Sequence, residues 1–172
     1  MSGAVCFSGH RPEKMPFDTG NKLYLDMFCS LLYMHANDAI RDGYDAFYCG
    51  MQRGVDIWAG KQIIKLKKIY PHIKLICVSP FEREINQRRG SDLEDYQDLL
   101  VNCDEFVPLH RDYVNGCYHE RNRYMVDRSA YLICALSEEK SGTAATLAYA
   151  KKHGLRVHSI DLRLFAEQYN LK

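Results

Sequence analysis

The sequence predicts an α/β protein, a three-layer α/β/α sandwich built around a mostly parallel sheet. Six short apolar runs rich in β-branched and aromatic residues recur along the chain, and longer segments with helical spacing lie between them. Strands that alternate with helices pair in parallel, because each helix carries the chain back to the same end of the sheet. The apolar runs contain few charges, which is typical of strands that helices cover on both faces.

The elements alternate from the N-terminus onward, without repeats, low-complexity segments or a linker, so we expect one domain over residues 1–172. Most of the strand-like runs stop at serine, glycine or proline, and the helical segments are long enough to repeat apolar residues every three or four positions. In chain order the predicted strands are 4–7, 46–49, 73–78, 105–109, 130–136 and 155–159, and the predicted helices are 18–42, 54–69, 91–102, 115–128 and 141–153.

Composition narrows the class of protein. The formal net charge of the 172 residues is +1, which argues against a large basic surface for nucleic acid. No apolar run approaches the roughly 20 residues that cross a bilayer, and the N-terminus lacks a secretory signal. The seven cysteines are an odd number, and several lie in apolar runs where reduced thiols pack well. We therefore expect a cytoplasmic protein that needs no membrane and no cofactor.

Polar residues beside glycine follow the first strand, as Ser8-Gly9-His10-Arg11. In open parallel sheets ligands bind beyond the carboxyl ends of the strands, where the strand order reverses. Gly9 either makes the turn or admits a ligand to the backbone, and Arg11 either meets water or meets the ligand's negative charge. His10 has the pKa range of a general base, but contact with a ligand or support of the turn explains it better.

The second and fifth strands end in the same way. Gly50 and Gly54 bracket the turn CGMQRGVDIWA, which fits neither the Rossmann fingerprint nor a P-loop. It is either a glycine-capped turn or a helix start that receives an anion. Ser141-Gly142-Thr143 opens the last predicted helix, where serine is either a helix cap or part of a phosphate-binding turn. Three such strand ends favour one shared ligand site.

Other segments offer weaker signals. Arg121 and Asn122 lie on the 115–128 helix and could close over the same pocket. The 80–90 loop, PFEREINQRRG, is either a mobile lid over an anionic ligand or an exposed basic loop. Cys117 and His119, with a nearby His110, lack the paired spacing of a zinc site, so we predict no metal. The tyrosines to check for stacking on a base are Tyr118 and Tyr124.

The motifs SGHRP, GMQRGVDIWA, RNRYMVDRSAYLI and SGTAATLAYAKKHG together resemble the YpsA-like family of the SLOG superfamily, whose relatives include the DprA/Smf and LOG proteins. The resemblance runs from residue 3 to about residue 158. It implies a Rossmann-like fold with a pocket for a nucleotide or nucleotide-derived ligand at the strand ends, and by analogy a homodimer. The ligand-binding residues that it implies are Gly9, His10, Arg11, Gly50, Met51, Gly54, Val55, Asp56, Gln87, Arg121, Asn122, Gly142, Thr143 and Thr146, together with Met125 on the helix motif.

Departures from the related patterns bear on catalysis. Ser141 replaces the first glycine of a Gly-Gly-Thr pattern, which keeps a donor for phosphate, and no tryptophan follows Gln87 closely. LOG enzymes cleave the N-glycosidic bond of nucleoside monophosphates with a glutamate that aligns with Thr146. A hydroxyl cannot stabilise an oxocarbenium-like charge or activate water as a carboxylate does.

Three functions follow as hypotheses. The first is the binding or sensing of a nucleotide-like small molecule. The second is an N-glycosidase-type hydrolase that recruits another acid, Asp56 or Glu120, although Asp56 in a first helical turn also complements the helix dipole. The third is single-stranded DNA binding as in the DprA relatives, which the near-zero net charge disfavours.

Overall fold

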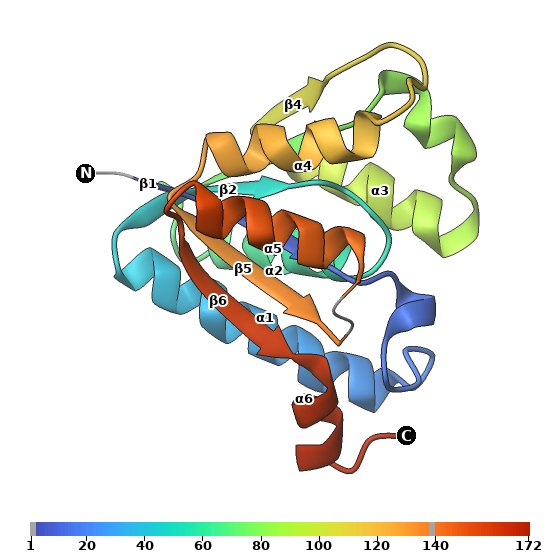
Figure 1. Cartoon of the computed structure of the whole chain (residues 1–172), viewed down its shortest axis with the longest axis vertical. Coiled ribbons are helices and arrows are strands. Elements are labelled where there is room, and N and C mark those ends of the chain that lie inside the picture. Colours follow the sequence, from blue (N-terminus) through green and yellow to red (C-terminus); the bar gives the residue numbers. More distant parts are fainter. Residues whose placement is uncertain (1–2, 138–139) are drawn as a thin grey trace.

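The computed structural model describes residues 3–137 and 140–172 and contains a six-stranded sheet with helices on both faces (Figure 1). All five strand pairings are parallel, and the strand order is β4-β3-β2-β1-β5-β6. The three-layer, Rossmann-like fold is therefore confirmed. The strands are β1 (Gly3–Gly9), β2 (Tyr44–Cys49), β3 (Lys74–Ser79), β4 (Glu105–Pro108), β5 (Tyr131–Leu136) and β6 (Arg156–Asp161). The helices are α1 (Lys22–Arg41), α2 (Val55–Lys67), α3 (Gly90–Asn102), α4 (Cys117–Asp127), α5 (Gly142–Lys152) and α6 (Leu162–Gln168), with the short 3-10 helices η1 (Pro12–Lys14) and η2 (Glu82–Gln87).

The helix ends differ from the predicted ends where a side chain sets the boundary. Helix α1 begins at Lys22 rather than at residue 18, because the Asn21 side chain accepts the N–H groups of Leu23 and Tyr24 and caps the helix. Helix α6 was not predicted. It follows β6 directly, and Asp161 is both the last strand residue and the helix cap, so no loop separates the two elements in the sequence.

Two hydrophobic cores lie on the two faces of the sheet. The larger one packs β1, β2 and β3 side chains against α1, α2 and α6, and it contains the ring contacts of Phe28 with Trp58 and Phe165. The smaller one lies under α4 and α5, which cover the opposite face (Figure 1). Helix α2 is buried along most of its length, so its first turn is held firmly against the sheet.

The strand order reverses at β1. The chain adds β2, β3 and β4 on one side of β1 and then returns to place β5 and β6 on the other side. The connections that leave β1 and β5 therefore diverge toward opposite faces and open a crevice at the carboxyl ends of these strands. This reversal point is where the sequence predicts the ligand site.

Backbone atoms at the end of β1 contact the start of α2 directly. The Val55 N–H donates to the His10 carbonyl at 3.2 Å, and Gly54 takes a φ of 95° that favours glycine. A Cβ on Gly54 would lie 2.3 Å from the His10 carbonyl oxygen, and a Cβ on Gly9 would lie 2.4 Å from the Val55 side chain. Val55 thus fills the space beside the Gly9 Cα, so close packing against α2 is enough to require a glycine here, and a ligand contact at Gly9 stays a prediction.

Replacing Gly54 by alanine should destabilise the fold more than replacing Gly43, although both glycines have a positive φ. Gly43→Ala should cost only the strain of that backbone conformation, about 1–2 kcal/mol, because no atom lies within 4 Å of its Cβ position. Gly54→Ala adds overpacking against the β1 backbone and should cost about 2–5 kcal/mol. Urea unfolding of both variants measures the difference. Equal losses would contradict the close contact between β1 and α2.

Candidate functional site

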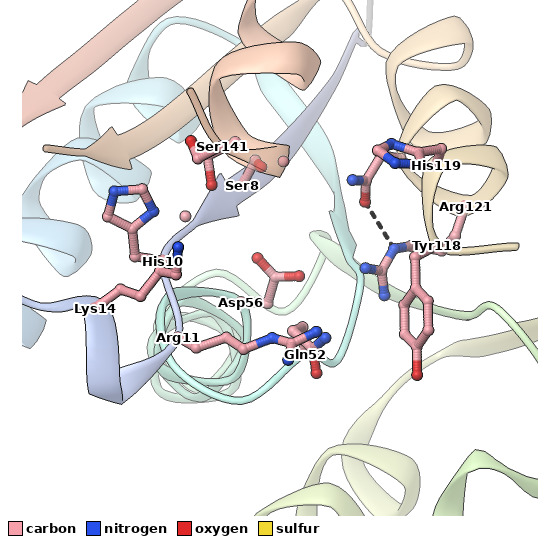
Figure 2. A pocket seen from close by; sticks show the side chains of 14 residues that line it. Ser8, His10, Arg11, Lys14, Gln52, Asp56, Tyr118, His119, Arg121 and Ser141 are labelled. Atoms are coloured by element: carbon pink, nitrogen blue, oxygen red, sulfur yellow. Dashed lines mark hydrogen bonds between the residues drawn. The ribbon is translucent and has the colours of Figure 1, made fainter. Parts of the chain in front are cut away.

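A cavity of about 370 Å³ opens at the carboxyl ends of β1, β2 and β5. Helix α4 forms one wall, and the first turns of α2 and α5 form others (Figure 2). In Figure 2 His10 and Lys14 lie on one side, Tyr118, His119 and Arg121 on the opposite side, and Asp56 between them. The lining residues are Ser8, Gly9, His10, Arg11, Lys14, Gln52, Asp56, Tyr118, His119, Arg121, Asn122, Ser141, Gly142 and Thr143.

The cavity gathers most of the predicted ligand-binding residues. Those that line it are Gly9, His10, Arg11, Asp56, Arg121, Asn122, Ser141, Gly142 and Thr143. Gly50, Met51, Gly54 and Val55 lie behind the wall, where they shape the β2–α2 turn. Gln87 and Thr146 line two smaller neighbouring hollows. The described lining carries three cations, Arg11, Lys14 and Arg121, and a single carboxylate, Asp56, so its charge favours an anionic ligand.

His10 ties the end of β1 to the segment after β5. Its Nε2 accepts the backbone N–H of Ser137 at 2.9 Å, and its side chain is buried. Of the roles considered for this histidine, the structure therefore displays support of the turn. The next residue, Arg11, is exposed at the cavity mouth, where its guanidinium is accessible to a ligand.

Asp56 is a buried carboxylate that faces the cavity. Its exposed fraction is 5 %, and burial raises its pKa from an ordinary 3.8 to about 6, while the neighbouring Arg121 opposes that rise. The backbone N–H of Gln52 also donates to it. A Cβ on Gly50 would lie 2.7 Å from Asp56 Oδ2 and 3.0 Å from the Arg121 guanidinium. Gly50 is therefore bare because these two side chains occupy its space.

Arg121 connects helix α4 to the end of β2. Its Nη1 donates to the Gly50 carbonyl, and its Nε donates to Asn122 Oδ1 at 2.8 Å. The guanidinium also lies 5.8 Å from the centre of the Tyr118 ring. The arginine thus contributes positive charge to the cavity while it fixes the position of α4.

The N-terminus of α5 forms the wall opposite α2. The Ser141 hydroxyl accepts the Ala144 N–H at 3.1 Å, so the helix-cap interpretation of Ser141 is confirmed. Gly142 has no atom within 4 Å of its Cβ position, and its φ is not positive. Neither packing nor backbone geometry in the described protein requires a glycine there. Its bare Cα instead leaves the cavity open at a helix N-terminus, where an anion is favoured.

The 80–90 segment is partly helical, and one of its arginines is buried. It contains η2, and Arg88 is only 4 % exposed. The Arg88 guanidinium binds Glu84 at 2.9 Å, Asp92 at 3.0 Å and the Met51 carbonyl at 3.0 Å. The prediction of an exposed basic segment is therefore wrong for Arg88, whose charge is paired with carboxylates four residues away on either side, whereas Arg83 and Arg89 are exposed. Met51, with a φ of 58°, is held in its turn by this contact.

Thr146 does not line the main cavity. Its hydroxyl donates to the Gly142 carbonyl at 3.0 Å, one turn earlier in the same helix. It borders a hollow of about 260 Å³ between α4 and α5. Thr146 is the residue that aligns with the LOG glutamate in the sequence. It lies outside the lining of the main cavity, and its side chain has no carboxylate.

Several lining residues were not among the predicted ligand contacts: Ser8, Lys14, Gln52, His119 and Tyr118, the last of which was considered only for stacking on a base. Lys14 follows Arg11 by three residues, which places both on one side of a 3-10 turn. Gln52 lies inside the glycine-bracketed turn. Ser8 belongs to the end of β1, whereas Tyr118 and His119 are brought in by the packing of α4, which the sequence does not specify. Tyr124, the other tyrosine considered for base stacking, lies outside this cavity, with the Arg128 guanidinium 3.5 Å from its ring centre.

Two further features of the described chain bear on chemistry. In residues 3–137 and 140–172 no three His, Cys, Asp or Glu side chains gather where they could hold a metal ion. None of the helices described there combines the length and the apolar character needed to cross a membrane.

The fold is similar to that of solved DNA processing proteins. It matches DNA processing protein A from Helicobacter pylori with a TM-score of 0.63 at 17% identity, over 97% of this chain and 72% of that chain. It matches DprA from Streptococcus pneumoniae with a TM-score of 0.60 at 15% identity, over 92% of this chain and 50% of that chain. These likenesses place the chain among the Rossmann-like α/β proteins to which DprA belongs.

The family is narrower than the fold. The YpsA family model, described as the YspA SLOG family, matches residues 5–165, and the chain therefore belongs to that family. It is 29% identical to a UPF0398 protein from Halalkalibacterium halodurans over 127 residues, which is 73% of this chain and 67% of that protein. The predicted resemblance to the YpsA-like family is confirmed.

The raised pKa of Asp56 predicts a pH-dependent stability difference between the wild type and Asp56→Asn. The folded protein keeps this proton up to pH of about 6, whereas the unfolded chain releases it near pH 4, so ionisation disfavours folding. Relative to Asp56→Asn, the wild type should lose about 3 kcal/mol of stability as the pH rises from about 4 to about 6, and no more above that. Urea unfolding at several pH values measures this loss. Parallel profiles for the two proteins would contradict the assignment.

Proposed function

We propose that this protein binds or senses a nucleotide or nucleotide-derived ligand in the main cavity. The observation that carries the proposal is the wall at α5. A glycine that the described protein does not require, Gly142, lies at a helix N-terminus that faces Arg11, Lys14 and Arg121 across a cavity. Phosphate suits such a wall, since backbone N–H groups, hydroxyls and guanidinium groups are its usual partners in proteins.

The single carboxylate supports a ligand that carries more than phosphate. A buried Asp56 would repel a bare anion, whereas a hydroxyl of a sugar can donate to it. The cavity of about 370 Å³ also falls in the usual size range of small-molecule sites. A ligand with both a phosphate and a sugar matches the cations and the carboxylate of the cavity better than phosphate alone. A homodimer, expected by analogy with SLOG relatives, stays a prediction.

A hydrolase is a second candidate, and Asp56 is the observation that favours it. A carboxyl group with a pKa of about 6 in a shielded cavity is suited to exchange a proton with a leaving group near neutral pH. The orientation of the Thr146 hydroxyl toward its own helix weighs against a LOG-type reaction. Binding without turnover is therefore the function that we favour.

Single-stranded DNA binding is a third candidate. Its support is the structural similarity to the Helicobacter pylori protein, which is described as binding single-stranded DNA. DNA binding that depends on several phosphate contacts weakens steeply with salt. A net charge of +1 gives this protein little long-range attraction for a polyanion, so we rank this candidate below a small ligand.

Gly142→Ala should abolish or strongly weaken ligand binding without loss of stability. The added methyl group would occupy the anion-binding end of the cavity, while alanine in a helix is more stable than glycine by about 0.5–1 kcal/mol. Thermal-shift titration with nucleotides, NAD, ADP-ribose and cyclic dinucleotides measures both effects. Arg11→Ala should reduce the ligand-induced shift as well, because it removes a cation at the cavity mouth.

Arg41→Ala is the matched control, since Arg41 is an exposed arginine on α1 that does not line the cavity. It should bind ligand as the wild type does. Chromatography of the mixtures should show intact ligand, whereas released base would favour the hydrolase. Binding that survives Gly142→Ala unchanged, or the absence of any ligand-induced shift in the wild type, would contradict the proposed site.

A further inference from the structure

A second hollow adjoins the main cavity on the side away from α5. Its volume is about 150 Å³, and Arg11, Gln52 and Tyr118 line both spaces. The two spaces therefore adjoin at these three residues, and we call them together the groove. Its lining extends from the N-terminus of α5 past the ends of β1 and β2 to η2. Gln87, the last residue of η2, lies at the far end of this groove.

The charges of the second hollow are largely paired within the protein. Arg88 binds both Glu84 and Asp92, and Arg53 is paired with Glu13. A second phosphate would thus find few free cations in this part of the groove. A neutral group that forms hydrogen bonds suits it better, because such a group needs no counter-charge.

Two carboxamides offer hydrogen bonds to such a group. Gln52 Oε1 accepts the Arg53 N–H at 3.2 Å and lies 3.5 Å from Arg88 Nη2, which leaves the Gln52 NH₂ group to donate into the groove. The side chain of Gln87 is exposed and makes no hydrogen bond within residues 3–137 and 140–172. Glutamine side chains recognise the edges of nucleobases through paired donor and acceptor contacts.

Tyr118 supplies an aromatic ring at the junction of the two spaces. The ring packs edge-on against Phe81, with centroids 6.4 Å apart, and the Arg121 guanidinium lies 5.8 Å from its centre. These contacts hold the ring in place before any ligand arrives. A fixed ring beside a hydrogen-bonding edge suits a flat heterocycle, since bases stack on aromatic side chains.

We propose that the second hollow is the nucleobase subsite of this groove. The phosphate of the ligand then lies at α5, its sugar near Asp56, and its base against Tyr118 with an edge toward Gln52 and Gln87. The inference rests on the proposed function and adds the direction in which the ligand lies. In this arrangement a nucleotide binds more tightly than a sugar phosphate because its base contacts Gln52, Gln87 and Tyr118.

Calorimetric titration with ribose 5-phosphate, AMP, GMP, CMP and UMP tests this assignment. At least one nucleotide should bind about tenfold or more tightly than ribose 5-phosphate, which has no base. The double variant Gln52→Ala with Gln87→Ala should lose about tenfold in affinity for that nucleotide, the effect of two hydrogen bonds. Gln87→Ala alone should leave the affinity for ribose 5-phosphate unchanged, because Gln87 lines the second hollow and not the main cavity. Tyr118→Phe should bind the nucleotide, whereas Tyr118→Leu should lose about tenfold because stacking is removed.

Gln97→Ala, at an exposed position of α3 that does not line the hollow, is the matched control and should match the wild type. Equal affinity of the wild type for ribose 5-phosphate and for every nucleotide would overturn the base subsite and leave the proposed function standing. An unchanged nucleotide affinity in the double variant would do the same. No binding of these probes would overturn the subsite, and no shift with NAD, ADP-ribose or a cyclic dinucleotide either would overturn the proposed function with it.

Discussion

The contact between the end of β1 and the start of α2 is the constraint on which the site depends. Two glycines allow it: Gly9 leaves room for the Val55 side chain, and Gly54 leaves room for the His10 carbonyl. Because the two backbones meet here, Arg11 from the first connection and Asp56 from the second enter the same cavity. A wider separation would place the cationic rim and the buried carboxylate in different parts of the surface.

Two arginines then hold the β2–α2 turn from both sides. Arg121 reaches it from α4 and binds the Gly50 carbonyl, while Arg88 reaches it from the segment after β3 and binds the Met51 carbonyl. Consecutive backbone carbonyls are thus bound by charged groups on separate elements. The turn that carries Gln52 and Asp56 is therefore positioned by tertiary contacts, which supports a cavity that is formed before a ligand binds.

The sequence predicted the sheet and the location of the cavity well, because both follow from local patterns. Apolar runs ending in glycine and polar residues mark strand ends, and parallel strands bring those ends together. The roles of individual residues were harder to predict. Gly9 must be glycine because the Val55 side chain occupies the space of a Cβ, and Gly50 must be glycine because Asp56 and Arg121 do. These neighbours are distant in sequence or lie across a turn. The burial of Arg88 was not predicted, although Glu84 and Asp92 lie four residues away on either side, the spacing at which helical ion pairs form. The entry of His119 into the cavity depends on how α4 packs, and no local pattern encodes that packing.

The His10 ring has a consequence for the loop before α5. Because Nε2 accepts the Ser137 N–H, the proton of the neutral ring lies on Nδ1. The hydrogen bond thus links the ends of β1 and β5, the neighbouring strands at the reversal point, and it fixes the ring orientation that this link requires.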